Sequence, residues 1–287
     1  MLDKIILLKI NHFLDLIRFY KPIGFMLLMW PCWFALTLIP TNQLFLLKWY
    51  FLFLIGAFLM RSAGCIINDI VDINIDQNIK RTSERPLTSK KLTIKESLIF
   101  LFILLIISFL ILIQFNLNSI IIGMFSIPLI IIYPFMKRYT YWPQLLLGII
   151  FSWGIFIVCF QFSNKLELQF ILLYFGCIFW TLGYDTIYAY QDLEDDIKNN
   201  IKSTAVLFKN KGIHFVKFFY LIFLSIIGYI SWESSKNLYS LIVIILYIFA
   251  INLLLNRWNI KSKSNSNYYF KINNYIGLAC FVFLLIF

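Results

Sequence analysis

Long apolar runs of similar length, separated by short polar segments, make up most of this chain of 287 residues. No charged residue occurs between Ser97 and Met136 or between Tyr139 and Asn164. Runs of this length are typical of helices that cross a bilayer, because the hydrocarbon core takes about 20 residues of helix. The pattern predicts nine transmembrane helices, at residues 22–40, 45–67, 96–115, 118–136, 143–161, 168–191, 212–232, 238–256 and 268–287.

The composition supports this interpretation and indicates the fold class. Hydrophobic residues make up 61% of the chain and charged residues 14%, and the mean hydropathy of +0.82 exceeds that of soluble proteins. No polar linker divides the chain, so we expect a single all-α integral membrane domain over residues 1–287. The 5 cysteines stand singly, which argues against a disulfide framework or a zinc site.

The net charge of +11 is distributed unevenly between the two sides of the predicted membrane domain. Most of the 25 basic residues fall before the first span or in every second loop after it, and the exceptions are Lys48, Arg61, Lys165 and Lys236. Positively charged loops stay in the cytoplasm, so the asymmetry predicts a cytoplasmic N-terminus. The excess charge thus reports orientation and argues against nucleic-acid binding.

Two short acidic segments interrupt the apolar pattern at the ends of the predicted second and sixth spans. They hold more than half of the 14 acidic residues. Within each segment, polar residues recur at intervals of three or four and therefore share a helical face. These residues are Asn68, Asp72 and Asp76 in the first segment and Asp185, Tyr188, Asp192 and Asp196 in the second. The similarity of the two segments suggests two related groups of helices around one cavity.

Ionisable groups beside a bilayer core usually mark a functional site. Carboxylates in such numbers share a pocket only when cations neutralise them. Oxygen ligands without histidine or cysteine favour Mg²⁺ or Mn²⁺, and Mg²⁺ readily shares its ligand shell with phosphates. Two segments therefore suit two ions that bridge a diphosphate. Basic residues that can contact the remaining phosphate oxygens follow each segment, namely Lys80, Arg81 and Arg85 after the first and Lys198 and Lys202 after the second.

Several ordered motifs in these regions match a known family. They are Lys21-Pro22-Ile23-Gly24, Trp30-Pro31, the segment from Arg61 to Asp76, Lys80-Arg81-Thr82, Arg85-Pro86-Leu87, residues 133–140, Pro143-Gln144, residues 183–196 and residues 201–205. In these motifs the chain resembles the intramembrane aromatic prenyltransferases, and within them the 4-hydroxybenzoate polyprenyltransferases of ubiquinone biosynthesis. The resemblance covers nearly the whole chain. It departs from the family at Tyr20 and Glu194, where many relatives carry Asp.

The resemblance implies nine helices around a central cavity that opens sideways to lipid, with both acidic segments on the cytoplasmic side of a bacterial inner membrane. It implies transfer of a polyprenyl group from polyprenyl diphosphate to the ring carbon ortho to the hydroxyl of 4-hydroxybenzoate. No obligate protein partner is expected. The residue roles that it implies are one Mg²⁺ at Asn68, Asp72 and Asp76, a second at Asp192 and Asp196, diphosphate binding by Arg81, Lys198 and Lys202, an essential cation at Arg138 near the cavity mouth, and further substrate contacts at Lys21, Arg85, Asp185 and Tyr188.

Other functions remain as alternatives on sequence grounds. A prenyltransferase of the same superfamily could act on dihydroxynaphthoate, homogentisate, haem or a glycerol phosphate lipid. A divalent-cation transporter would place its carboxylates near the membrane midplane. Here both acidic segments stand at span ends and are followed by Lys and Arg, which repel cations and attract diphosphate. A purely structural subunit is disfavoured because burying two carboxylate clusters is costly.

Overall fold

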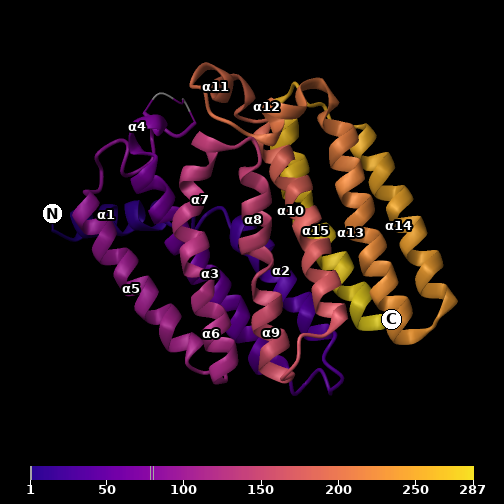
Figure 1. Ribbon diagram of the computed structural model, residues 1–287. Coiled ribbons are helices and arrows are strands. Elements are labelled where there is room, and N and C mark those ends of the chain that lie inside the picture. The colour runs from indigo at the N-terminus through magenta and orange to yellow at the C-terminus, as the bar shows by residue number, and fades with distance from the viewer. Residues whose placement is uncertain (1, 78, 80) are drawn as a thin grey trace.

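The computed structural model describes residues 2–77, 79 and 81–287, with side chains from residue 7 onward. Within this part of the chain every regular element is helical (Figure 1). The elements are α1 (Leu2–Leu16), α2 (Ile23–Thr37), α3 (Leu47–Val71), α4 (Ile73–Asp76), α5 (Ile94–Leu112), α6 (Leu117–Phe125), α7 (Ile127–Tyr139), α8 (Pro143–Ser152), α9 (Gly154–Phe162), α10 (Leu168–Ala189), α11 (Leu193–Lys198), α12 (Thr204–Phe208), the 3₁₀ turn η1 (Lys209–Lys211), α13 (Gly212–Ser235), α14 (Leu238–Asn256) and α15 (Lys263–Ile286). Lys80, one of the cations predicted to face a diphosphate, lies outside the described residues.

The nine predicted spans each coincide with helical structure. Eight helical segments of the described chain are long and apolar enough to cross a membrane. Two of these eight are interrupted within the predicted span, one between α6 and α7 and one between α8 and α9, and a third begins with α12 and η1 before α13. The first predicted span corresponds to α2, a shorter apolar helix of 15 residues. The prediction of an all-α membrane fold is thus confirmed.

Both interruptions have an identifiable cause or stabilising contact. The first lies at Ser126, two residues before Pro128, whose ring lacks an N–H and collides with the carbonyl of the preceding turn. The Ser126 hydroxyl donates to the Gly123 carbonyl at 2.7 Å, which satisfies one carbonyl at the break. The second lies at Trp153, and its indole Nε1 donates to the Ile122 carbonyl of α6 at 2.8 Å. The two broken spans are therefore joined to each other at their breaks.

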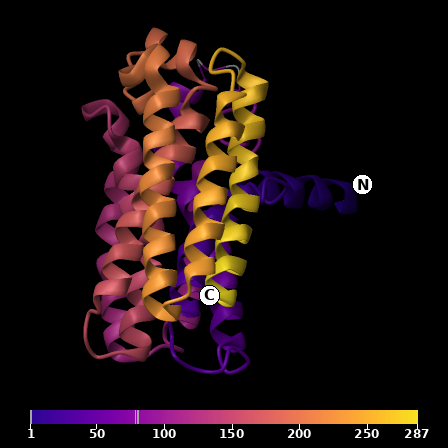
Figure 2. The same ribbon diagram turned by 90° about the vertical axis from the view of Figure 1, so that its right-hand side faces the viewer.

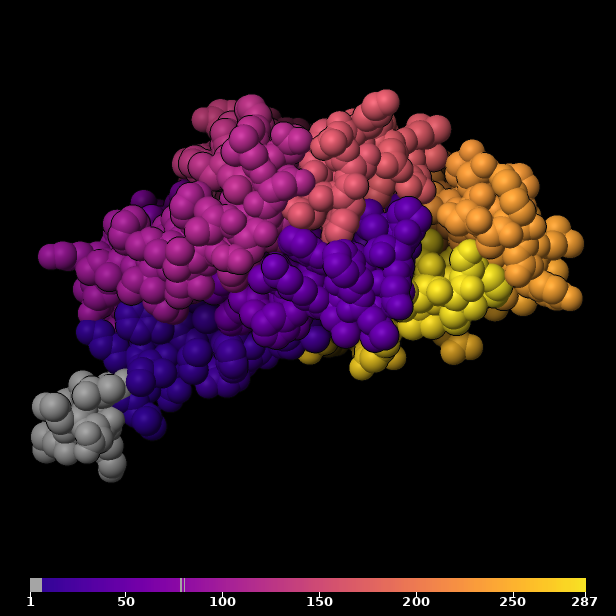
Figure 3. All heavy atoms as spheres, turned by 90° about the horizontal axis from the view of Figure 1, so that it is seen from below, coloured from indigo at the N-terminus to yellow at the C-terminus, as the bar shows by residue number. Residues whose placement is uncertain are grey.

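The helices pack around α10, the most buried of the spans. It contacts α2, α8, α9, α13 and α15, and α14 packs on the far side of α13. The last span returns to the first, because α15 packs against α2. Seen from below, the yellow C-terminal helix lies beside the purple N-terminal segments (Figure 3). The first and last parts of the chain thereby close the bundle.

A cavity of about 1610 Å³ lies within this arrangement. Its lining comes from α1 to α11, from α15 and from the loops between them, whereas α13 and α14 contribute no lining residue. One end of the cavity is polar and lies at the top of the bundle, beside α4 and α11 (Figure 1). The opposite end is apolar and is lined by Phe53, Leu112, Phe115 and Ile157. The cavity therefore runs lengthwise between the helices.

The N-terminal helix has a different orientation from the spans. Figure 2 shows α1 leaving the side of the bundle at a steep angle to the long helices. Its C-terminal part is anchored, because Leu16 and Ile17 are buried in a cluster with Leu59 and Leu104. This orientation and its apolar exposed residues are typical of a helix that lies along a membrane surface.

Candidate active site

The structure brings the two acidic segments to the same cavity. Asp72 and Asp76 line it from the end of α3 and from α4, and Asp192 and Asp196 line it from the start of α11. Asp72, Asp76 and Asp196 are buried, and Asp192 is partly exposed. Because the segments are more than 100 residues apart in the sequence, only the packing of α3 against α7, of α7 against α8 and of α8 against α10 places them together.

The spacing predicted that the acidic residues of each segment lie on one unbroken helix. In the structure both helices break within or before these segments. Helix α3 ends at Val71, so Asp72 is its cap and Asp76 lies in the separate helix α4. Helix α10 likewise ends at Ala189, before Asp192. Aspartate competes for backbone hydrogen bonds and favours such helix boundaries. The i to i+4 neighbours nevertheless stay on adjacent turns, because the N–H groups of Asp72, Asp76 and Asp196 donate to the carbonyls four residues earlier at 2.9, 2.9 and 2.8 Å.

Three of the four carboxylates, Asp72, Asp76 and Asp192, have a basic partner among the described residues. Lys137 forms an ion pair with Asp72, and Arg85 Nη1 donates to Asp76 at 2.6 Å. Arg81 donates to both oxygens of Asp192, through Nε at 2.8 Å and Nη2 at 2.6 Å. Together with the hydrogen bond from Arg81 Nη1 to the Tyr188 hydroxyl at 2.8 Å, these contacts connect the loop after the first acidic segment to the second.

The donor atoms of this site fit a hard divalent cation. No group of three or more His, Cys, Asp or Glu side chains gathers closely enough to hold a metal among the residues with described positions. However, Asp72 Oδ1 is buried without a hydrogen-bond partner, and a buried carboxylate oxygen of this kind is costly unless a ligand completes its environment. Asn68, Asp72, Asp76, Asp192 and Asp196 all line the cavity and offer oxygen ligands, which suit Mg²⁺.

Burial and neighbouring charges alter the titration of the groups at the polar end. The pKa of Asp196 is raised to about 7 because the carboxyl is buried and lies near Asp192. Burial also raises the pKa of Asp72, against the opposing effect of Lys137. The pKa of Lys21 is lowered by burial and by the nearby charges of Arg18, Arg81 and Arg85. Lys21 therefore belongs to a concentration of positive charge that favours an anionic ligand.

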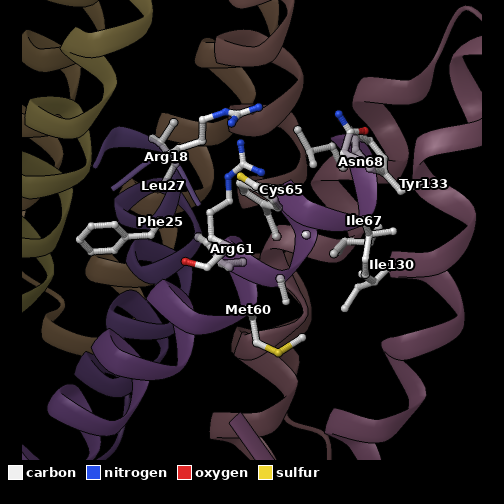
Figure 4. Close-up of a pocket in the computed structure, with 18 of the residues that line it drawn as sticks. Arg18, Phe25, Leu27, Met60, Arg61, Cys65, Ile67, Asn68, Ile130 and Tyr133 are labelled. Carbon is white, nitrogen blue, oxygen red and sulfur yellow. The ribbon is translucent and has the colours of Figure 1, made fainter. Parts of the chain in front are cut away.

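A second set of polar residues lies deeper in the cavity. Arg61, Cys65 and Asn68 come from one face of α3, and Tyr133 comes from α7 on the other side of the pocket (Figure 4). Along a helix Arg61 is about 16 Å from Asp72. A Cβ on Gly24 would lie 2.7 Å from Arg61 Nε, so glycine leaves room for this guanidinium. Arg61 is thus a cation in the apolar region of the protein, directly beside the cavity.

Asp185 faces the cavity from α10 and is within electrostatic range of Arg61. It makes no hydrogen bond or ion pair to another described residue. Tyr188, one turn further along α10, packs its ring against Phe270 with the centroids 4.7 Å apart and accepts from Arg81. Both side chains are therefore placed to contact a molecule inside the cavity.

The predicted cations divide into two groups in the structure. Lys21, Arg81, Arg85 and Lys202 line the cavity. Lys198, in contrast, is exposed and does not line it. Arg138 is not among the lining residues either; its Nη2 donates to the Val71 carbonyl at 3.1 Å and lies 3.9 Å from Asp72 Oδ1.

The sequence interpretation did not identify Lys137 and Arg61 as site residues. Tyr133 and Lys137 are four residues apart and share a helical face that turns Arg138 away, and both line the cavity. Apart from Lys48 near its start, Arg61 is the one charged residue in the second predicted span, and a charged side chain in the interior of a span is a functional signal by itself. Helical periodicity applied to these two residues would have found both.

Relatives of similar length and sequence are named as 4-hydroxybenzoate octaprenyltransferases. The 4-hydroxybenzoate octaprenyltransferase of Histophilus somni (strain 2336) is 39% identical over 285 residues, covering 96% of this chain and 96% of its own. The enzyme of the same name from Pseudoalteromonas translucida (strain TAC 125) is 35% identical over 278 residues, covering 96% and 94%.

Solved structures share the fold. A UbiA homolog from Aeropyrum pernix K1 superposes with a TM-score of 0.71 at 20% identity and covers 89% of this chain and 96% of its own. A UbiA homolog from Archaeoglobus fulgidus bound to GPP and Mg²⁺ superposes with a TM-score of 0.69 at 15% identity, covering 96% and 100%. The profile of the UbiA prenyltransferase family matches residues 28–275. The chain therefore belongs to the UbiA prenyltransferase family.

Proposed function

We propose that this protein transfers a polyprenyl group from polyprenyl diphosphate to 4-hydroxybenzoate, at the ring carbon ortho to the hydroxyl and meta to the carboxylate. The observation that carries the proposal is that both acidic segments and the cations Lys21, Arg81, Arg85 and Lys137 line one end of a cavity whose other end is apolar. A long prenyl chain with a diphosphate head has the same division into a charged end and an apolar tail. The names of the full-length relatives agree with this reaction.

The head group belongs at the polar end in this proposal. Asn68, Asp72 and Asp76 would hold one Mg²⁺, and Asp192 and Asp196 a second. When bound, Mg²⁺ neutralises charge on the diphosphate and makes it a better leaving group. The site cations bind phosphate oxygens that the metals leave uncovered, and guanidinium groups do so with two parallel hydrogen bonds. They are Lys21, Arg81, Arg85, Lys137 and Lys202, and we retain Lys198 as a more distant contributor.

The aromatic acceptor belongs in the deeper polar set. Arg61 is a fixed positive charge suited to the benzoate carboxylate. Asp185 and Tyr188 lie on the facing helix α10 and are suited to the phenol end. A carboxylate next to the acceptor can take the proton that leaves when the new carbon–carbon bond restores the aromatic ring. Arg138 supports the site from outside, through its contact with the carbonyl next to Asp72.

The apolar part of the cavity suits the prenyl tail. Departure of diphosphate from an allylic carbon leaves a cation, which the ring faces of residues such as Phe25, Tyr133 and Phe151 can stabilise. The same lining excludes water, which would otherwise react with the cation. Phe53, Leu112, Phe115 and Ile157 then contact the distal isoprene units.

The proposal includes the orientation of the protein in the membrane. We infer that the protein resides in a bacterial inner membrane with its N-terminus and both acidic segments on the cytoplasmic side. The support is the excess of Lys and Arg in the loops at that end.

The decisive experiment uses membranes that contain the protein. They are incubated with 4-hydroxybenzoate, a polyprenyl diphosphate and Mg²⁺, and the product is detected by its mass, with EDTA as the control. A coupled product that disappears with EDTA supports the proposal. Product with dihydroxynaphthoate, homogentisate or haem but none with 4-hydroxybenzoate would assign another acceptor, and divalent-cation uptake without any prenyl donor would favour a transporter.

A further inference from the structure

Asp69 belongs to the first acidic segment but points away from the face that Asn68 and Asp72 share. On a helix it is turned by about 100° from Asn68. Its exposed fraction is 1%, and Arg18 Nη2 donates to its two oxygens at 2.7 and 2.8 Å. Arg85 Nη1 donates to Oδ1 as well, at 3.0 Å. Asp69 is therefore saturated by two guanidinium groups and is unsuited to bind a metal directly.

Arg85 is shared between two carboxylates. The same nitrogen, Nη1, lies 3.0 Å from Asp69 Oδ1 and 2.6 Å from Asp76 Oδ2. A guanidinium and a divalent cation compete for the lone pairs of one carboxylate, so metal binding at Asp76 weakens its contact with Arg85. Asp69 is then the carboxylate that still holds Arg85 at the edge of the cavity.

Arg18 extends this contact to the N-terminal part of the chain. Its φ of 61° places it in the left-handed region, at the point where α1 ends. Arg18 Nη1 donates to the carbonyls of Asp15 and Leu16 at 3.0 and 3.1 Å, and these are among the carbonyls that a helix end leaves free. The Lys21 N–H in turn donates to the Arg18 carbonyl at 2.9 Å. Asp69 thus fixes, through Arg18, the turn that carries Lys21.

We propose that Asp69 is a positioning residue of the prenyl transfer site. It keeps Arg85 and, through Arg18, Lys21 directed at the diphosphate while Asp76 serves the metal. The proposal rests on the function proposed above. Without the charge of Asp69, Arg85 pairs with Asp76 alone, so it competes more strongly with Mg²⁺ and loses its second anchor.

The substitution Asp69→Asn tests this, because it removes the charge and keeps the shape. Purified protein is titrated with Mg²⁺ in the presence of inorganic pyrophosphate, and the thermal unfolding midpoint is followed. We expect the Mg²⁺ concentration at half-saturation to rise about ten- to a hundredfold, the usual effect of losing a residue that orients a metal ligand. The KM for polyprenyl diphosphate rises with it, whereas the KM for 4-hydroxybenzoate stays at the wild-type value. Glu167→Gln, which removes an exposed carboxylate before α10 that does not line the cavity, leaves all three values unchanged.

A double-mutant cycle with Arg85→Gln separates positioning from general loosening of the structure. If Asp69 acts through Arg85, adding Asp69→Asn to Arg85→Gln changes the Mg²⁺ half-saturation little further. Should Asp69→Asn not fold, Arg18→Gln gives a second test, since it leaves the Asp69–Arg85 contact intact. That variant is expected to raise the KM for polyprenyl diphosphate without raising the Mg²⁺ half-saturation.

Two results would overturn the inference. The first applies to a preparation whose wild-type protein transfers prenyl groups. There, Asp69→Asn would have the same Mg²⁺ half-saturation as the wild type, or Arg18→Gln would have the same KM for polyprenyl diphosphate. The other is full additivity in the double-mutant cycle. A wild-type protein that transfers no prenyl group and does not respond to Mg²⁺ with pyrophosphate refutes the proposed function itself, and the inference with it.

Discussion

Arg81 and Asp192 are 111 residues apart in the sequence and form a two-pronged ion pair, with Nε and Nη2 donating to the two carboxylate oxygens at 2.8 and 2.6 Å. The pair joins the loop after the first acidic segment to the start of α11, so it closes the polar end of the cavity. Both residues also belong to the proposed binding site for a metal-bound diphosphate. The pair therefore has to open, at least in part, when substrate binds.

Removing either acidic segment's central carboxylate is expected to abolish turnover. Asp72→Ala and Asp192→Ala are each expected to lower the rate of prenyl transfer by at least about a hundredfold, because each deletes a proposed metal ligand. The rate is measured by mass spectrometry of the coupled product, with circular dichroism to confirm the fold. Glu194→Gln is the matched control, since Glu194 is exposed, does not line the cavity and, among the described residues, forms an ion pair with Lys263 alone, at 3.7 Å. Near-normal turnover in both alanine variants would end the assignment of metal ligands.

The raised pKa of Asp196 predicts a dependence of Mg²⁺ binding on pH. A pKa of about 7 means that this carboxyl holds its proton below neutral pH, and Mg²⁺ has to displace the proton to bind. Lowering the pH from 8 to 6 is therefore expected to raise the half-saturating Mg²⁺ concentration by up to about tenfold at this site. The Ser203 hydroxyl donates to Asp196 and lowers its pKa, so Ser203→Ala shifts the midpoint of this dependence to higher pH. A half-saturation that is equal at pH 6 and pH 8 contradicts the prediction.

Substitutions of Arg61 and of Lys21 are expected to raise the KM of different substrates. Arg61→Leu raises the KM for 4-hydroxybenzoate by about ten- to a hundredfold, the value of a lost hydrogen bond to a charged group, and leaves the KM for polyprenyl diphosphate unchanged. Lys21→Gln has the opposite pattern. Arg61→Lys restores part of the affinity because it keeps the charge without the planar donor pair. Initial-rate kinetics with each substrate varied in turn provide the measurement, and the same KM pattern in both variants would count against separate subsites.

The apolar end of the cavity predicts a preference for donor length. Leu112→Trp fills part of this end, so the ratio of kcat/KM for a long polyprenyl diphosphate to that for geranyl diphosphate is expected to fall about tenfold. Leu110→Trp is the control, because Leu110 lies on the same helix, is exposed and does not line the cavity. An unchanged ratio in Leu112→Trp would place the prenyl tail elsewhere.

The sequence did not show which of the two adjacent residues Lys137 and Arg138 faces the site. Both are basic, adjacent and equally consistent with a helix end at the membrane surface. In the structure Lys137 pairs with the buried Asp72, while Arg138 is exposed and reaches the backbone of Val71. A rotation of about 100° per residue separates the two side chains, and which face of α7 meets α3 depends on packing.

The sequence by itself determined the features that depend on local chain properties. The nine spans follow from apolar runs, because each run has to match the bilayer thickness independently of its neighbours. The oxygen-rich character of the site follows from Asp72, Asp76, Asp192 and Asp196, whose spacing keeps them on adjacent turns even where the helices break.

Only the tertiary structure decided which distant groups meet. The contacts of Arg81 with Asp192, of Lys137 with Asp72 and of Arg18 with Asp69 join segments that no local pattern connects. Their geometry depends on how α3, α7 and α10 pack, and many similar apolar side chains can satisfy that packing without leaving a sequence signature. The long-range ion pairs are therefore determined by the packing of the helices, whereas the sequence determines only which charged residues are available to form them.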